Sequence, residues 1–250
     1  MDKKQVIGVV GGVGPFAGVD LLRKIAEQTA AARDQDHLPV LSISDPGPIV
    51  DRTAFLLGQT PENPGRAMAE QVRLLARMGA TVVGIPCNTA HAPPIFGVIR
   101  AETAGLPIRL LHMIEETGRF LQTNYPEVKR VGILSTVGTY QAGVYPQILA
   151  GAGFTAVTPP RHILEKYVHP AICHPEYGIK ALGAAAERAR ADLLRGAAAL
   201  REAGAQAVIL GCTEIPLVIT ESRIDGMVVV DPTLILARAL ILAAGGVVQG

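Results

Sequence analysis

Two cysteines, Cys87 and Cys212, are the residues of this 250-residue chain whose type and position most favour chemistry. A thiolate can take a proton as a general base, and a thiol can deliver one as a general acid. Each cysteine follows a short apolar run, at a point where a strand should give way to a helix. Helix N-termini and nearby cations lower a thiol's pKa from its usual value of about 8.5. The pair therefore predicts removal of a proton from one face of a carbon and delivery to the other.

An internal repeat gives these two cysteines equivalent positions. Ile7-Gly8-Val9-Val10 matches Val131-Gly132-Ile133-Leu134, 124 residues further on, and each is followed by Val-Gly. Cys87 and Cys212 lie 125 residues apart, and each follows a Gly-Ala pair and an apolar run. We therefore expect two homologous halves whose cysteines approach one cleft from opposite sides.

The elements that must position these residues follow an α/β pattern of apolar runs alternating with longer helical segments. We expect strands at 5–10, 38–44, 81–86, 107–111, 130–134, 154–158, 206–210 and 227–230. We expect helices near 17–32, 63–78, 92–104, 114–124, 141–151, 180–203 and 233–244. The predicted fold is two similar doubly wound parallel-sheet domains related by pseudo-twofold symmetry, with the active site in the cleft between them. The first domain would hold 1–115 plus 228–250 and the second 116–227, and the loop at 58–65 would be a mobile cover over the site.

Composition excludes several partners. Lys plus Arg number 23 and Asp plus Glu 22, so no net field attracts nucleic acid or an anionic membrane surface. The apolar runs are far shorter than the roughly 20 residues that a membrane span needs. No export signal is visible, which predicts a cytoplasmic protein whose three cysteines stay reduced.

Polar residues near the predicted turns are candidates for holding a small acid. Backbone and side-chain donors at helix starts bind carboxylates, and cations stabilise the charge of a developing carbanion. The substrate-binding candidates are Gly14, Arg52, Asn88, Thr89, Thr136, Lys180 and Thr213. His91 and Glu214 are candidates for tuning the thiols.

The same residues allow other interpretations. Buried cysteines often only pack, and Arg52 and Lys180 could be ordinary solvated charges. Cys173 has no counterpart in the first half, and the Cys and His residues provide no four-ligand metal set, so we expect no metal. Gly12, Gly14 and Ala17 fit a loose dinucleotide pattern. The ribose-binding acidic residue should end the second strand about 20 residues on, but Asp45 there lies 31 residues after Gly14, and Asp34 and Asp36 precede that strand.

The motifs together resemble the aspartate/glutamate racemase superfamily, in its aspartate racemase branch. They are Gly11-Gly12-Val13-Gly14-Pro15, Asp51-Arg52-Thr53, Pro86-Cys87-Asn88-Thr89-Ala90-His91, Leu134 to Thr139, Lys180 and Gly211-Cys212-Thr213-Glu214-Ile215-Pro216. Val13 replaces the usual Met, and the segment 169–176 follows no pattern that we can match. The resemblance implies a two-cysteine mechanism without pyridoxal phosphate (PLP) or any other cofactor, carboxylate recognition by Arg52 and Lys180, and a homodimer.

The expected activity is therefore cofactor-independent racemisation of an acidic amino acid, with aspartate as the first candidate. Glutamate or a broader range of amino acids is the main alternative. A maleate isomerase or hydantoin racemase on the same scaffold also stays open. A non-catalytic small-acid binding protein is the remaining alternative, and loss of one cysteine would have favoured it.

Overall fold

The computed structural model describes residues 5–250 and divides into two compact units. Unit 1 holds the described residues up to Glu116 together with Thr233–Gly250, and unit 2 holds Thr117–Pro232. The sequence expectation placed these divisions after residues 115 and 227.

The sheet of unit 1 has four parallel strands in the order β2-β1-β3-β4. Its strands are β1 (Ile7–Val10), β2 (Val40–Ile43), β3 (Val82–Gly84) and β4 (Arg109–Leu110). Its helices are α1 (Pro15–Gln28), η1 (Asp34–Asp36), α2 (Arg52–Leu56), α3 (Gly65–Arg77), η2 (Thr89–His91), α4 (Pro93–Glu102) and most of α12 (Pro232–Ala243). The strand order reverses direction between β1 and β3, and ligands bind at such points in doubly wound sheets.

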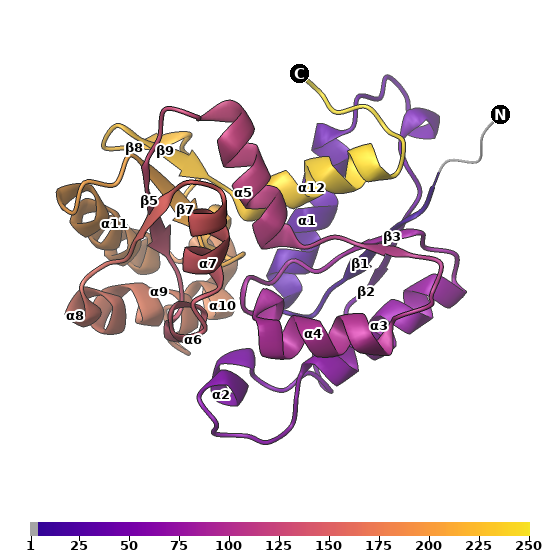
Figure 1. Cartoon of the computed structure of the whole chain (residues 1–250), viewed down its shortest axis with the longest axis horizontal. Coiled ribbons are helices and arrows are strands. Elements are labelled where there is room, and N and C mark those ends of the chain that lie inside the picture. Colours follow the sequence, from indigo (N-terminus) through magenta and orange to yellow (C-terminus); the bar gives the residue numbers. More distant parts are fainter. Residues whose placement is uncertain (1–4) are drawn as a thin grey trace. The chain divides into compact units, whose positions relative to one another are not determined.

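Helices cover both faces of this sheet, which explains why its central strands are apolar throughout rather than alternating. On one face, Val72 and Leu75 of α3 and Ile95 of α4 share a buried cluster with Val83. On the other face α12 approaches β3 so closely that a Cβ at Gly84 would lie 2.9 Å from Leu240. Figure 1 shows α3 and α4 on one side of the strands and α1 and α12 on the other.

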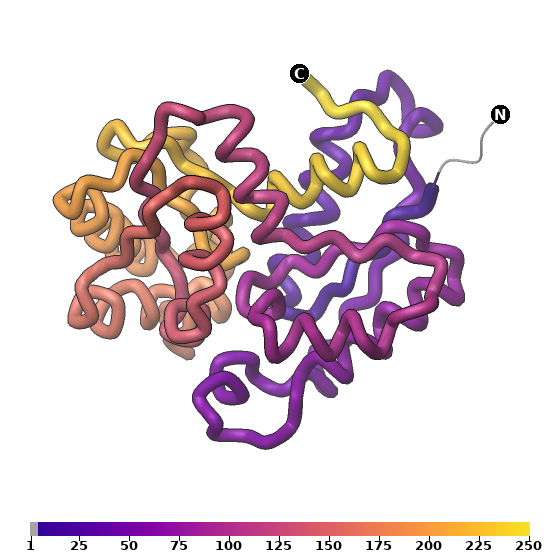
Figure 2. The backbone as a smooth tube through the Cα atoms, in the orientation of Figure 1, coloured from indigo at the N-terminus to yellow at the C-terminus, as the bar shows by residue number. Residues whose placement is uncertain are grey.

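The C-terminal segment belongs to unit 1 because it returns to the first helix. Gln249 donates its backbone N–H to the carbonyl of Gln28, and Ala30 donates to Val247. The tube in Figure 2 shows this yellow segment beside the indigo α1. Residues more than 200 positions apart in sequence therefore complete one α/β layer.

The sheet of unit 2 has five strands in the order β6-β5-β7-β9-β8. They are β5 (Arg130–Leu134), β6 (Thr155–Val157), β7 (Ala207–Leu210), β8 (Arg223–Ile224) and β9 (Met227–Val230). Four neighbouring strands of this sheet, β6-β5-β7-β9, repeat the order β2-β1-β3-β4 of unit 1, as the internal repeat predicts. β9 pairs with β7 and so lies in unit 2, which moves the second division from residue 228 to the start of α12.

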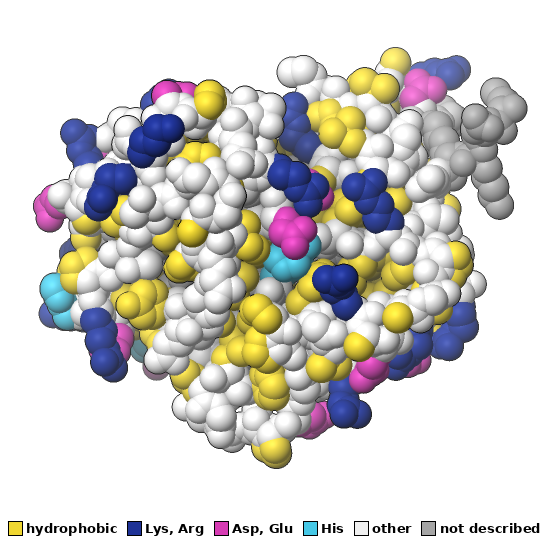
Figure 3. All heavy atoms as spheres, in the orientation of Figure 1, with side chains coloured by type: hydrophobic (Ala, Val, Ile, Leu, Met, Phe, Trp, Pro, Cys, Tyr) yellow, Lys and Arg dark blue, Asp and Glu magenta, His cyan; other side chains and the backbone are white. Residues whose placement is uncertain are grey.

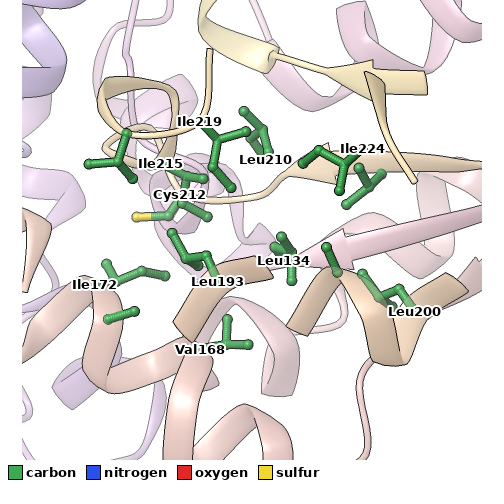
Figure 4. Close-up of a cluster of buried hydrophobic side chains, with 14 of the residues drawn as sticks. Leu134, Val168, Ile172, Leu193, Leu200, Leu210, Cys212, Ile215, Ile219 and Ile224 are labelled. Carbon is green, nitrogen blue, oxygen red and sulfur yellow. The ribbon is translucent and has the colours of Figure 1, made fainter. Parts of the chain in front are cut away.

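Within the described residues, this sheet is surrounded by most of α5 (Met113–Asn124) and by nine further helical segments. They are α6 (Val137–Gln141), α7 (Val144–Gly151), α8 (Arg161–Ile163), η3 (Leu164–Val168), α9 (His169–Cys173), α10 (Ile179–Leu182), η4 (Gly183–Ala185), α11 (Glu187–Glu202) and η5 (Ile215–Leu217). α11 packs directly on β5, since a Cβ at Gly132 would lie 2.9 Å from Leu200. Figure 4 shows this core with the sulfur of Cys212 directed away from Leu200 and Ile224.

One local prediction was wrong, and two elements were not predicted from the sequence. The helix expected over 180–203 is broken around Gly183, whose φ is +58°, so α10 and α11 are separate. The region 161–173 is helical, although Pro170 and its mixed polarity hid the period. β8 is an antiparallel edge strand, joined to β9 through Asp225 and Gly226, both at positive φ. Asp-Gly between two apolar residues is a hairpin signal that the sequence did carry.

The surface agrees with the balanced composition. Figure 3 shows Lys, Arg, Asp and Glu side chains scattered over the visible face without a patch of one sign. Among residues 5–250, no helix has the length and apolar character to cross a membrane.

Candidate active site

Cys87 lies just beyond the carboxyl end of β3, beside the point where the strand order of unit 1 reverses. Its backbone N–H donates to the carbonyl of Ile85 over 2.8 Å, which turns the chain sharply after the strand. The next residues form η2, and the Pro93 start of α4 follows it. Cys87, Asn88 and Thr89 are all buried. The turn therefore holds a thiol, an amide and a hydroxyl together at the sheet edge.

His91 contacts the main chain of Cys87 rather than its thiol. Its Nδ1 lies 2.8 Å from the carbonyl oxygen of Cys87. Its ring stacks on Phe96 and meets His112 edge-on, with centroids 5.0 and 4.7 Å apart. Burial, and secondarily the neighbouring His112, lowers the pKa of His91 to about 3. The ring is thus neutral near pH 7, and its contact is suited to positioning the turn.

The glycine turn after β1 passes close to the backbone that follows β2. A Cβ at Gly12, whose φ is +78°, would lie 2.9 Å from the nitrogen of Pro46. Gly14 is the N-cap of α1, and Pro15 fits the first helical position because it needs no N–H there. Val13, the residue that departs from the family pattern, lies in the hydrophobic core of unit 1 with Val10.

Arg52 is the first residue of α2, a short helix that lies against η2. Asp51 caps this helix by accepting the N–H of Ala54 over 2.8 Å. Arg52 is half-buried, and its Nε is buried. The sequence-predicted Arg52 and the Cys87 turn thus come together within unit 1, and the intervening loop at 58–65 is largely exposed.

The matching turn of unit 2 follows β5. Thr136 caps α6, and its Oγ1 accepts the backbone N–H of Thr139 over 3.3 Å. The hydroxyls of these two threonines lie 3.2 Å apart, and both residues are buried. A Cβ at Gly211 would lie 2.8 Å from the carbonyl of Leu134, so only glycine lets the Cys212 turn pass this close to β5.

Cys212 lies beyond the carboxyl end of β7, in contact with a carboxylate. Its Sγ is 2.9 Å from Oε2 of Glu214, and Oγ1 of Thr213 is 3.4 Å from the same oxygen. Cys212 is 9% exposed and Glu214 only 2%. Burial and then the Glu214 carboxylate raise the pKa of Cys212 well above its usual range, while the charge of Lys180 opposes them.

The segment 169–176, which sequence patterns left unexplained, builds the turn before Lys180. His174 stacks on Tyr177 at 4.0 Å, and the guanidinium of Arg188 lies 3.7 Å from the Tyr177 ring. A Cβ at Gly178 would meet the backbone of His174 at 2.6 Å, so this turn is tightly closed. Lys180 itself is exposed at the start of α10.

Two further polar residues of unit 2 escaped the sequence analysis. Ser135 and Tyr145 line a small hollow together with Thr139. Burial first, and then the charge of Cys212, raises the pKa of Tyr145 well above its usual range. Ser135 directly precedes Thr136, so its place after β5 was a usable signal, whereas nothing in sequence placed Tyr145. Among residues 5–250, no three His, Cys, Asp or Glu side chains gather as a metal site would require.

Comparison with known proteins identifies the class of protein to which this fold and these two cysteine turns belong. The family model of the Asp/Glu/hydantoin racemases matches residues 10–240. The chain therefore belongs to this racemase family, which confirms the resemblance and the isomerase class expected from sequence.

Individual relatives refine this placement. The chain is similar to the solved structure of an aspartate racemase from Picrophilus torridus, with 28% identity, a TM-score of 0.81 and coverage of 98% of this chain and 96% of that one. A putative Asp/Glu racemase from Yersinia pestis follows, with 25% identity, a TM-score of 0.76 and coverage of 96% and 99%. A broad-specificity amino-acid racemase, RacX of Bacillus subtilis strain 168, is 26% identical over 153 residues. That match spans 59% of this chain and 62% of the relative.

Proposed function

We propose that this protein racemises an acidic amino acid, with aspartate as its first substrate, and that Cys87 and Cys212 are the two acid/base groups. One observation carries the proposal: each cysteine follows the third strand of its sheet, at the same place in two sheets with the same strand order. This is the edge at which doubly wound sheets bind ligands.

In the proposed reaction the substrate carboxylates are held before any proton moves. Arg52 and Lys180 supply the cationic contacts, and the Asn88, Thr89, Thr136 and Thr213 side chains with the Gly14 turn supply neutral donors. Charge-assisted contacts of this kind are short and orient a carboxylate strongly. Their second effect is to stabilise the negative charge that spreads onto the α-carboxylate when the α-proton leaves.

The thiolate of one cysteine takes the α-proton, and the thiol of the other protonates the opposite face of the planar carbanion. The carbon–hydrogen bond breaks to sulfur on one side, and a new one forms from sulfur on the other. Each turnover leaves the two protonation states exchanged, so the product complex is ready for the reverse reaction. The proposal requires no PLP, nucleotide or metal, since the two cysteines carry both proton transfers.

The choice of aspartate rests on the likeness to the Picrophilus torridus aspartate racemase. The match to a broad-specificity racemase favours a wider substrate range as the second candidate. A homodimer is part of the proposal on the family resemblance, and sedimentation velocity measures it directly.

Chiral chromatography tests the activity. Purified protein, treated with chelator and with carbonyl reagents that trap PLP, is incubated with each L-amino acid in turn. We expect D-aspartate to form fastest. Absence of a D-product from every amino acid would contradict the proposal, whereas fast racemisation of apolar amino acids alone would overturn the acidic specificity.

A further inference from the structure

We propose that Glu214 is a positioning residue that holds Cys212 as a thiol in the substrate-free protein, so that Cys212 enters the first turnover as the proton donor. This inference rests on the proposed function, because it assigns starting roles to the two cysteines of that mechanism. The sequence names Glu214 as a candidate for tuning a thiol but leaves open which cysteine begins as base and which as acid.

The contact that supports this role is short and buried. Cys212 donates its S–H to Oε2 of Glu214 over 2.9 Å, and only 2% of Glu214 is exposed. Loss of the thiol proton would leave a thiolate against a carboxylate in a site with little water to screen them. Like charges this close disfavour each other strongly at low dielectric.

The groups that face Cys212 come from several elements of unit 2. Glu214 lies in the same turn, Lys180 on α10, Cys173 on α9 and Tyr145 on α7. Lys180 is the cation among them, and it favours the thiolate. It is exposed at the start of its helix, whereas Glu214 is buried and in hydrogen-bond contact. Burial is the first cause that keeps Cys212 protonated, and of the two charged groups the Glu214 carboxylate outweighs Lys180.

The internal repeat shows that the two cysteines are not equivalent in this respect. The 125-residue offset that relates Cys87 to Cys212 relates Thr89 to Glu214. Thr89 is buried in η2 and carries an uncharged hydroxyl where unit 2 has a carboxylate. The two halves thus hold the same acid/base group in turns of different charge, and the carboxylate that favours a protonated thiol lies beside Cys212.

The test titrates Cys212 by itself. In a Cys87→Ser/Cys173→Ser protein, Cys212 is the one remaining thiol, and its thiolate is followed by absorbance at 240 nm and by the rate of iodoacetamide alkylation from pH 6 to 11. We expect little thiolate below pH 9. Adding Glu214→Gln should shift the titration downward by a pH unit or more, which raises the alkylation rate at pH 8 about tenfold.

Matched variants separate charge from folding. Glu202→Gln removes an exposed carboxylate at the end of α11 and should leave the titration unchanged. Glu214→Thr, which copies unit 1, should act like Glu214→Gln. If neither Glu214 variant folds by circular dichroism, the protein with Glu214 intact still decides the question, because a Cys212 midpoint at or below about 8.5 overturns the proposal.

A Glu214→Gln protein that folds and titrates like its parent would also overturn the inference. The titration uses no substrate, so its outcome is independent of turnover. Failure of racemisation would contradict the proposed function, whereas the thiol titration tests the role of Glu214 independently.

Discussion

Nδ1 of His91 lies 2.8 Å from the carbonyl oxygen of Cys87, so a buried ring fixes the main chain that carries one of the two thiols. Phe96 and His112 hold that ring in place by stacking and edge-on contact. The contact makes the position of Cys87 sensitive to the charge of a residue that does not touch its sulfur.

Acid should destabilise the protein through His91. Its pKa is lowered to about 3 in the folded state by burial, whereas an unfolded histidine titrates near 6.5. As pH falls below 6.5, the unfolded chain binds a proton that the folded chain refuses, and the free energy of unfolding drops by about 1.4 kcal/mol per pH unit. Urea unfolding at pH 7 and pH 5 measures this loss.

The matched variant is His91→Gln, which should be less stable than wild type at pH 7. Between pH 7 and pH 5 its free energy of unfolding should fall by about 2 kcal/mol less than that of wild type. His162→Gln, at an exposed position, should keep the wild-type slope. If the free energy of unfolding falls equally with pH in wild type and His91→Gln, His91 is not the source of the acid sensitivity.

Arg52 should matter for substrate and little for folding. Arg52→Ala is expected to lower kcat/KM by two orders of magnitude or more, because a charge-assisted contact to the substrate is lost, with little change in Tm. Arg66→Ala, an exposed arginine on α3, is the control and should retain activity. Unfolding of Arg52→Ala, or normal kinetics, would show that Arg52 is not a substrate contact.

Lys180 should act on both the substrate and Cys212. Its charge favours the Cys212 thiolate, so Lys180→Ala should move the titration of that thiol to higher pH, opposite in sign to Glu214→Gln. Lys180→Arg should restore the titration. Lys166→Ala, also exposed in unit 2, should leave both the titration and kcat/KM unchanged. A downward shift in Lys180→Ala would refute the electrostatic role.

Gly178 should be required for the turn that precedes Lys180. An alanine Cβ would meet backbone atoms of His174 at 2.6 Å, which we expect to cost about 1–3 kcal/mol and to raise KM by displacing Lys180. Gly97→Ala in α4 meets no atom within 4 Å and should instead stabilise the protein by about 0.5–1 kcal/mol. Thermal unfolding and steady-state kinetics of both variants test this contrast.

Much of the fold could be predicted because local sequence patterns indicate the strands. Ile7–Val10 and Val131–Leu134 are apolar and glycine-punctuated, and their repetition predicts two sheets of one topology. The break at Gly183 and the helical run at 161–173 could not be predicted. Their conformations depend on tertiary packing, such as the close approach of Val168 to Gly196 of α11.

The residue types of the candidate site could be predicted from the sequence, but the contacts between its side chains could not. Cys87 and Cys212 stand out by position in the repeat, and Glu214 by its place two residues after a cysteine. The hydrogen bond that Glu214 accepts from the Cys212 thiol depends on a side-chain rotamer, and the contact of His91 with the main chain of Cys87 depends on the path of η2. No spacing rule encodes either geometry.

The most direct test of the two-thiol account is isotope exchange in heavy water. Because a thiol proton exchanges with solvent, the product enantiomer should carry deuterium from the first turnovers while recovered substrate carries much less. Cys87→Ala and Cys212→Ala should each abolish racemisation, and each remaining thiol should exchange the α-proton of one enantiomer alone. Equal early labelling of substrate and product, or near wild-type racemisation by either variant, would contradict the account.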